Sequence, residues 1–255
     1  MTVLITGAAG GVARMLVPRL RADHKLRLTD LVAAPDLAGL PVVPGDVADP
    51  AFAAEITSGV DAVVHLAGDP RPDATWAAVL RPNVEAAATV LQAAQDNGAR
   101  RVVVASSIHA MGGHLHRPPT SPVDARWAPH PCCRYGASKV FVEQAGRVTA
   151  ESGRTSVVAL RLGGCRPHPP ADSWLPTWLA PEDLAHLVTR AVEADVHWGV
   201  YFGVSANTRS PFDLGVTVDD LGYRPRHDSE AYADTVPAGA GGATCPPARP
   251  TRELP

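Results

Sequence analysis

Tyr135 and Lys139 are the two side chains of this sequence best suited to acid–base chemistry. They stand four residues apart in YGASK, at the start of a predicted helix, and therefore share one helix face. An ammonium beside a phenol favours the phenolate and lowers the phenol's pKa. A phenol so tuned can exchange a proton with a substrate hydroxyl near neutral pH. Ser107, which follows the apolar run RVVVA, could hydrogen-bond the substrate oxygen. The alternative is an incidental surface pair.

The N-terminal stretch MTVLITGAAGGVAR predicts a phosphate-binding turn. Val3 to Ile5 indicate a short buried strand, and a helix is expected to follow. Gly7 permits a sharp turn, Gly10 permits close approach of a pyrophosphate, and Ala13 permits tight packing of helix on sheet. The helix N-terminus would present free N–H groups and a positive dipole to phosphate. A purely structural turn is the alternative.

Two aspartates follow the next predicted strands. Asp30 ends the strand 25–29, about 20 residues past the glycines, where a carboxylate can bind both ribose hydroxyls of NAD and repel the 2′-phosphate of NADP. Helix capping or a loop position is its alternative role. Asp46 follows the strand 42–44 and could accept from an adenine amino group, or could cap the predicted helix 50–57.

A fourth strand is predicted at 61–66, with small residues behind it. Ala67 and Gly68 would leave room for the adenosine-ribose side of a dinucleotide. A long helix is expected over 75–95, broken only by Pro82. Asn83 lies inside it and is assigned to the cofactor side, where it could hydrogen-bond a strand or a water chain; a tolerated surface asparagine is the alternative.

The alternation of apolar runs and helical segments continues to residue 204. Further strands are expected at 101–105, 156–161 and 200–204, and further helices at 135–152 and 181–194. This pattern predicts an α/β fold with a doubly wound parallel sheet and a small C-terminal substrate-binding portion. We expect one domain over 1–235, with substrate-binding loops at about 108–131 and 163–180, and a flexible tail over 236–255, which is rich in Pro, Gly and Ala.

Composition narrows the classes of partner. The 255 residues suit one α/β domain, and a net charge of −3 gives no reason to expect a nucleic-acid partner. The cysteines at 132, 133, 165 and 245 show no C-x-x-C spacing, so we expect neither a metal site nor a disulfide framework. Reduced cysteines fit a cytoplasmic location, which we therefore expect. A membrane span and a secretory leader are not expected.

The segments TGAAGGVA, HLAG, VVVASSIHAMGG, YGASK and LRLGGCRP together resemble the extended short-chain dehydrogenases/reductases, the NAD-dependent epimerase/dehydratase group. Within that group TWLAPEDL, VYFGVSANT and LGYRPRHDSEAY resemble uronate dehydrogenases. The resemblance implies a Rossmann fold, NAD as cofactor and a homodimer or higher oligomer. It makes Tyr135 the proton-exchanging residue, Lys139 its activator and ribose anchor, and Ser107 the partner of the substrate oxygen. It also implies a cofactor site formed by Gly7, Gly10, Gly11, Val12, Asp30, Asp46, Val47, Leu66, Ala67 and Gly68.

The substrate positions depart from the uronate dehydrogenase pattern. Ile108 stands where that group has asparagine, and Gly164 where it has serine. Ser173 or a neighbour stands where it has the carboxylate-binding arginine, and Asp69-Pro70-Arg71 replaces a substrate serine. His109, Arg71, Arg134 and Arg166 could bind an anionic substrate differently, although a solvated surface position is the favoured alternative for each arginine.

We therefore predict an NAD-dependent oxidoreductase that acts on a secondary alcohol or lactol of a small sugar-like substrate. One alternative is an epimerase or dehydratase that retains its NAD. Another is a non-catalytic NAD-binding sensor or scaffold.

Overall fold

The computed structural model describes residues 1–116, 120–239 and 245, and its centre is one parallel sheet. Seven strands lie in the order β3-β2-β1-β4-β5-β6-β9, and every neighbouring pair is parallel. Their bounds are β1 Thr2–Thr6, β2 Lys25–Asp30, β3 Val42–Pro44, β4 Ala62–His65, β5 Arg101–Ser107, β6 Ser156–Leu162 and β9 Trp198–Gly203. The predicted doubly wound α/β fold is confirmed.

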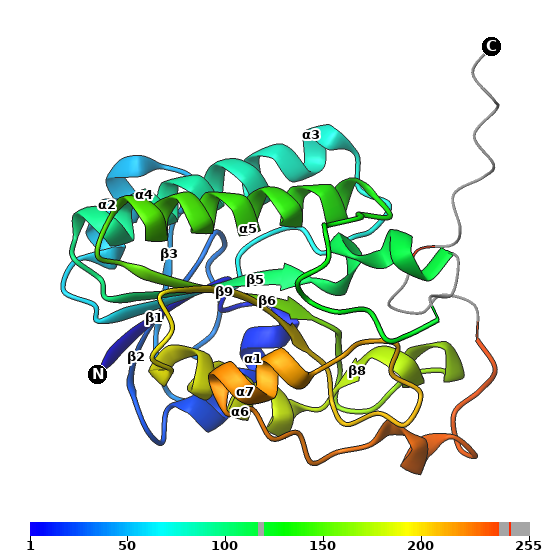
Figure 1. Cartoon of the computed structure of the whole chain (residues 1–255). Helices are drawn as coiled ribbons and strands as arrows, with labels where there is room; N and C mark the ends of the chain where they lie inside the picture. The colour runs from blue at the N-terminus through cyan, green and yellow to red at the C-terminus, as the bar shows by residue number, and fades with distance from the viewer. Residues whose placement is uncertain (117–119, 240–244, 246–255) are drawn as a thin grey trace.

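Helices cover both faces of this sheet (Figure 1). One layer holds α2 (Pro50–Thr57), α4 (Ala86–Asp96) and α5 (Arg134–Ser152); the other holds α1 (Gly11–Leu20), α6 (Pro181–Glu193) and α7 (Gly215–Leu221). Each layer packs on its own apolar core, with Val3, Ile5 and Leu16 in one and Leu4, Val63 and Leu91 in the other. Burial on both faces explains why the strands read as continuous apolar runs.

The predicted helix over 75–95 is built from three segments. The structure has α3 (Trp76–Val79), a π-helical turn η1 (Leu80–Glu85) and then α4. Pro82 has no N–H for an α-helical hydrogen bond, and a wider turn accommodates it. This π-helical turn buries Asn83, which is 1 % exposed, so its surface alternative does not hold.

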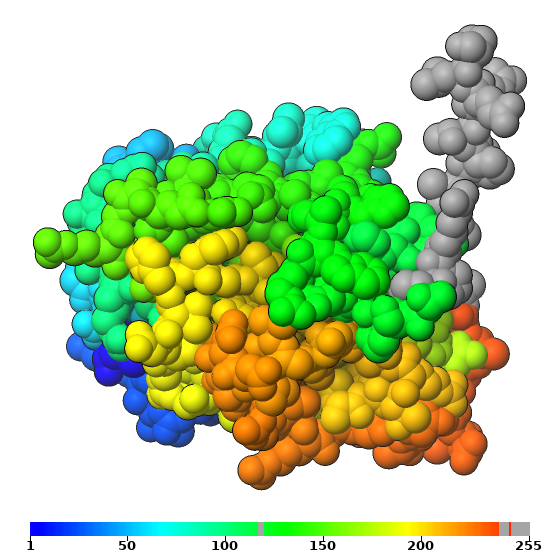
Figure 2. Space-filling model, in the orientation of Figure 1, coloured from blue at the N-terminus to red at the C-terminus, as the bar shows by residue number. Residues whose placement is uncertain are grey.

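The two expected substrate loops carry short elements of their own. Residues after β5 form the 3₁₀ turns η2 (Ile108–Ala110) and η3 (Gly112–His116). Residues after β6 form β7 (Gly164–Cys165), η4 (Asp172–Thr177) and β8 (Trp178–Leu179), and η5 (Ser229–Tyr232) lies nearer the C-terminus. Figure 2 shows the first loop (green) against the segment before α7 (orange), where Val123 pairs with Phe212.

The chain past Val236 is described only in part. The Pro237 carbonyl accepts from the Asp172 amide at 3.1 Å, and the Gly239 amide donates to the Asp172 carboxylate at 3.1 Å. Residues 236–239 are therefore fastened to the second loop. The remainder of the predicted flexible tail, apart from Cys245, lies outside the described residues. None of the helices in the described ranges is long and apolar enough to cross a bilayer.

Candidate active site

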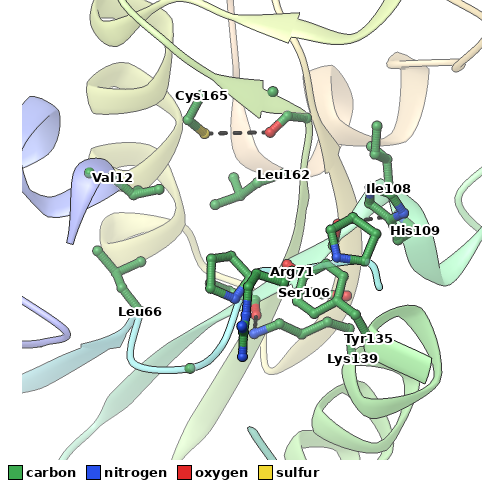
Figure 3. Close-up of a pocket in the computed structure, with 18 of the residues that line it drawn as sticks. Val12, Leu66, Arg71, Ser106, Ile108, His109, Tyr135, Lys139, Leu162 and Cys165 are labelled. Carbon is green, nitrogen blue, oxygen red and sulfur yellow. Dashed lines mark hydrogen bonds between the residues drawn. The ribbon is translucent and has the colours of Figure 1, made fainter. Parts of the chain in front are cut away.

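A cleft runs along the carboxyl ends of the central strands, where doubly wound folds bind ligands. It consists of two cavities of about 490 and 340 Å³ that share Leu66, Gly68 and Asp69. The smaller cavity adjoins β1, β2 and β3, and the larger lies over the ends of β5 and β6. Figure 3 shows Tyr135 and Lys139 reaching the larger cavity from α5, with Val12 and Leu66 on its other side.

The glycine turn between β1 and α1 is shaped to receive a phosphate group. Gly7 has φ +72°, and a Cβ there would stand 2.7 Å from the Ala67 nitrogen. A Cβ on Gly11 would meet nothing within 4 Å, so the start of α1 faces open space. Among the described side chains none caps this helix and none in its first turn is acidic. Its free N–H groups and positive dipole remain available to an anion.

Asp30 lies where a dinucleotide's adenosine ribose would be expected. It lines the smaller cavity with Gly7 and Gly10, and its two oxygens accept from the amides of Ala9 (2.9 Å) and Val32 (3.3 Å). A carboxylate has further lone pairs, so it can still accept from ribose hydroxyls. The same side chain thus orders the glycine turn and faces the cavity.

Asp46 and Val47 line the same cavity, and the capping role considered for Asp46 belongs to Asp49 instead. The Asp49 carboxylate accepts from the Ala51 amide at 2.8 Å as the N-cap of α2. Burial opposes ionisation of Asp46, but the Ala48 amide and the Arg81 guanidinium hold its pKa below the ordinary value. Asp46 is therefore a charged acceptor at the cavity wall.

Leu66, Ala67 and Gly68 line the middle of the cleft, whereas Asn83 lies behind it. The Asn83 side chain accepts from the Asp69 amide at 2.6 Å and donates to the Asp69 carbonyl at 3.1 Å and to Ser138 Oγ at 3.0 Å. It is absent from the described lining of both cavities. The assignment of Asn83 as a cofactor contact is therefore corrected. Its side-chain amide instead bonds the Gly68–Asp69 turn and Ser138 of α5.

Ser107, Tyr135 and Lys139 line one wall of the larger cavity. The Lys139 ammonium donates to the Ala105 carbonyl at 2.9 Å and lies 5.7 Å from the centroid of the Tyr135 ring. Ser107 and Tyr135 are joined by a side-chain hydrogen bond. The three residues come from β5 and α5, and the fold brings them together as the sequence predicted.

The electrostatics of this trio differ from the prediction. Burial raises the pKa of Tyr135 to about 12, and the hydrogen bond with Ser107 offsets only part of that rise. Burial also lowers the pKa of Lys139 to about 8. Desolvation penalises both the phenolate and the ammonium, because both side chains are buried away from water. The expectation that the Lys139 ammonium makes the phenol acidic is therefore wrong, because burial raises the pKa of Tyr135 more than its neighbours lower it.

The predicted substrate residues divide into two groups. Ile108, His109, Arg71 and Gly164 line the larger cavity together with Arg166. Ser173 lines a separate cavity beyond Thr177, and Arg134 is exposed at the start of α5. The prediction of Ser173 as a substrate residue is therefore wrong, whereas its neighbour Trp174 does line the larger cavity. The Arg71 guanidinium pairs with Asp69 at 2.5 Å, and the Arg166 guanidinium lies 5.6 Å from the ring centroid of Trp174.

Several residues of the cleft were not predicted as site residues. Among them, Asp69, Ser106, Leu162, Cys165 and Trp174 line the larger cavity. Below it lies a fully buried ion pair, in which Glu143 accepts from Arg161 Nε and Nη2, each at 2.8 Å. Ser106 Oγ donates to Glu143 at 2.6 Å. The signal for this pair was present, since Glu143 and Arg161 are charged residues inside otherwise apolar stretches.

Three cysteines also meet at the substrate end. Cys132, Cys133 and Cys245 surround His109, with no disulfide among the four described cysteines. The expectation of no metal site considered spacing along the chain, which does not reveal a cluster made by folding.

The cleft has room for a dinucleotide at one end. At the other end its wall carries the Tyr135 phenol, which can exchange a proton. Chemistry of this kind is that of a dinucleotide-dependent oxidoreductase. Residues 3–165 match the NAD dependent epimerase/dehydratase family, and the chain belongs to that family.

Relatives support the same assignment along nearly the whole chain. NAD-dependent glucose-6-phosphate dehydrogenase of Haloferax volcanii is 32 % identical, over 90 % of this chain and 95 % of its own. Uronate dehydrogenase of Pseudomonas putida is 31 % identical, over 92 % and 88 %. A crystal structure of a variant uronate dehydrogenase from Agrobacterium tumefaciens in complex with NAD superposes with a TM-score of 0.84, at 28 % identity, over 98 % and 91 %. The predicted family, Rossmann fold, NAD cofactor and dehydrogenase class are confirmed.

Proposed function

We propose that this chain oxidises a secondary alcohol or lactol of a small sugar-like molecule. The observation that carries the proposal is the placement of Ser107, Tyr135 and Lys139 in a cavity continuous with the dinucleotide cradle. NAD⁺, when bound, supplies the hydride acceptor and a positively charged ring. Ser107 holds the substrate oxygen, and Tyr135 accepts the hydroxyl proton as phenolate.

Lys139 has two roles in this scheme. Its ammonium lies 5.7 Å from the centroid of the phenol ring, where a positive charge favours the phenolate, and it donates a hydrogen bond to the Ala105 carbonyl. Because burial, and to a lesser degree neighbouring negative charge, raises the pKa of Tyr135, the phenolate requires more than one neighbouring positive charge. Lys139 supplies one such charge, and it can also bind the cofactor ribose.

The size and charge of the cavity favour a monosaccharide-sized acid or phosphate. A volume of about 490 Å³ suits a small ligand beside the cofactor. Asp69 already neutralises Arg71, whereas the Arg166 guanidinium lies at the cavity over an aromatic ring. Arg166 is therefore the better candidate to bind a carboxylate or phosphate. Ile108 and Gly164 offer no side-chain hydrogen bond, so we propose a substrate other than a plain uronate.

A spectrophotometric screen tests this function. NADH formation is followed with uronates, aldoses and sugar phosphates, and an active anionic substrate should show a KM about tenfold higher with Arg166→Ala. Arg134→Ala is the matched control, since Arg134 is exposed outside the cavity. Isomerised or dehydrated product without net NADH, made on tightly retained NAD, would replace this proposal with the epimerase or dehydratase. An absence of hydride transfer with every compound would favour the sensor.

We also propose that the chain forms a homodimer through the layer of α3, α4 and α5. Large apolar side chains are exposed there: Trp76 on α3, Leu80 on η1, and Phe141 and Val148 on α5. Val148 is 65 % exposed, and burying such groups against a second copy would stabilise a dimer. Size-exclusion chromatography with light scattering should give twice the mass of 26.7 kDa, and Phe141→Glu should give monomer.

A further inference from the structure

We propose that His109, Cys132, Cys133 and Cys245 bind one zinc ion, or an equally thiophilic divalent cation, which holds Cys245 at the substrate end of the cleft. Three thiols and an imidazole form a donor set that zinc prefers in closed, four-coordinate structural sites. All four donor atoms lie within 4.8 Å of one another. The proposal rests on this geometry and not on the identity of the substrate.

The distances from His109 Nδ1 match a shared cation. They are 3.2 Å to Cys245 Sγ, 3.4 Å to Cys132 Sγ and 3.7 Å to Cys133 Sγ. In a tetrahedral site with ordinary zinc–sulfur and zinc–nitrogen bonds, the nitrogen-to-sulfur separation is about 3.6 Å. One ring nitrogen can make only a single good hydrogen bond, and thiols are weak partners. Three sulfurs converging on it are explained by an ion between them.

The surrounding backbone makes room for the cluster. A Cβ on Gly112 would stand 2.5 Å from Cys132 Sγ, and a Cβ on Gly136 would stand 2.3 Å from the His109 carbonyl oxygen. The Cys132 amide donates to that same carbonyl at 3.2 Å. Glycine at 112 and 136 is therefore what allows Cys132 and the first turn of α5 to lie against His109.

The helix α5 stabilises a thiolate at one of the four positions. Cys133 is its N-cap, and the Gly136 amide donates to Cys133 Sγ at 3.3 Å. The positive end of the helix dipole favours negative charge there. Binding a divalent cation replaces the protons of the coordinating thiols, so up to three protons leave when the site fills.

Occupation of the site would affect the cleft in two ways. His109 would have only Nε2 left for the substrate, because Nδ1 binds the metal. The ion would also hold Cys245 beside His109, as hydrogen bonds already hold Pro237 and Gly239 to Asp172. The ion would then form part of the substrate wall without taking part in hydride transfer.

Metal analysis of the untagged, full-length protein tests the proposal. Protein purified without chelators should carry about one zinc per chain. Cobalt should replace zinc and give the thiolate charge-transfer and intense visible bands of a tetrahedral site. Iodoacetamide should alkylate Cys132, Cys133 and Cys245 only after chelation.

Variants locate the site. Cys245→Ser should lower zinc affinity on the order of 100-fold or more, measured by competition with a chromophoric chelator. Cys245 lies outside the apolar cores, so this variant should retain the wild-type circular dichroism. Cys165→Ser is the matched control and should leave the affinity unchanged.

Three results would overturn the proposal. One is reduced protein that binds neither zinc nor cobalt at micromolar metal. Another is binding that Cys245→Ser and Cys132→Ser leave intact. The third is a disulfide that joins Cys245 to Cys132 or Cys133 in protein isolated anaerobically, since the bonded sulfurs could not ligate the ion.

Discussion

The Lys139 ammonium lies 5.7 Å from the centroid of the Tyr135 ring and is held there by the Ala105 carbonyl at 2.9 Å. Both side chains are buried in the wall of the larger cavity. The fold thus buries the Lys139 ammonium next to the Tyr135 phenol, and this burial of a charge lowers the stability of the folded protein. That cost can be measured.

Replacing Lys139 by Met should stabilise the protein at neutral pH while removing activity. Burial lowers the pKa of Lys139 from 10.5 to about 8, which corresponds to about 3 kcal/mol against the charged form. Loss of the hydrogen bond to the Ala105 carbonyl destabilises the variant by about 1 kcal/mol. The net gain in unfolding free energy is about 2 kcal/mol, and turnover should fall by about 100-fold or more.

The stability gain should depend on pH in a defined direction. Between about pH 8 and pH 10.5 the unfolded chain holds the lysine proton and the folded chain has released it, so wild-type stability rises with pH there. Tyr135 on α5 and His65 on β4 are the titratable neighbours to consider. Urea unfolding at about pH 7 and about pH 10 measures the difference, which should shrink at the higher pH. A variant less stable than wild type at neutral pH would contradict the argument.

Asp30 should set the preference for NAD over NADP. Its carboxylate lines the adenosine side of the cleft and would repel a 2′-phosphate. Asp30→Asn keeps the shape and removes the charge, so the ratio of kcat/KM for NAD to that for NADP should fall about tenfold, or about 1.4 kcal/mol. Asp36→Asn, an exposed residue after the same strand, should leave the ratio unchanged. An unaltered ratio in Asp30→Asn would place the adenosine ribose elsewhere.

The buried pair Glu143–Arg161 should be the costliest ionic contact to break. Arg161→Met leaves the Glu143 carboxylate uncompensated in the core, with an expected loss of about 3–5 kcal/mol in unfolding free energy. The double variant with Glu143→Leu should recover much of it. The exposed pair Arg147–Glu151 is the control, and Arg147→Met should cost at most about 1 kcal/mol. Equal losses from the two arginine variants would disprove the core role.

The elements could be predicted from the sequence because the signals for them are local. Buried strands such as Val3–Ile5 and the Tyr135–Lys139 spacing need only neighbouring residues to be recognised. The glycine turn and Asp30 follow from the chain order of the fold. Several predicted elements differ from the observed ones only at their ends, since β5 extends to Ser107 and β9 begins at Trp198. The predicted helix over 75–95 is three segments, and α7, β7 and β8 were not predicted.

The contacts that decide the site's chemistry are long-range and were not predicted. Asn83 fastens a turn to α5 through Ser138, and Cys245 reaches His109 from the far end of the chain. The raised pKa of Tyr135 depends on burial, which spacing alone does not give. Ser173 was misplaced because it and its neighbour Trp174 in η4 line different cavities, which spacing along the chain does not show.

Tyr135→Phe tests the central claim most directly, with NAD affinity and turnover measured on the same preparation. The variant keeps the ring packed against His109 and removes only the hydroxyl. We expect an NAD dissociation constant within about twofold of wild type and a kcat lower by about 10²- to 10⁴-fold. Tyr232→Phe, whose hydroxyl contacts His168 outside the cleft, should keep wild-type values of both. Wild-type turnover by Tyr135→Phe would contradict the account.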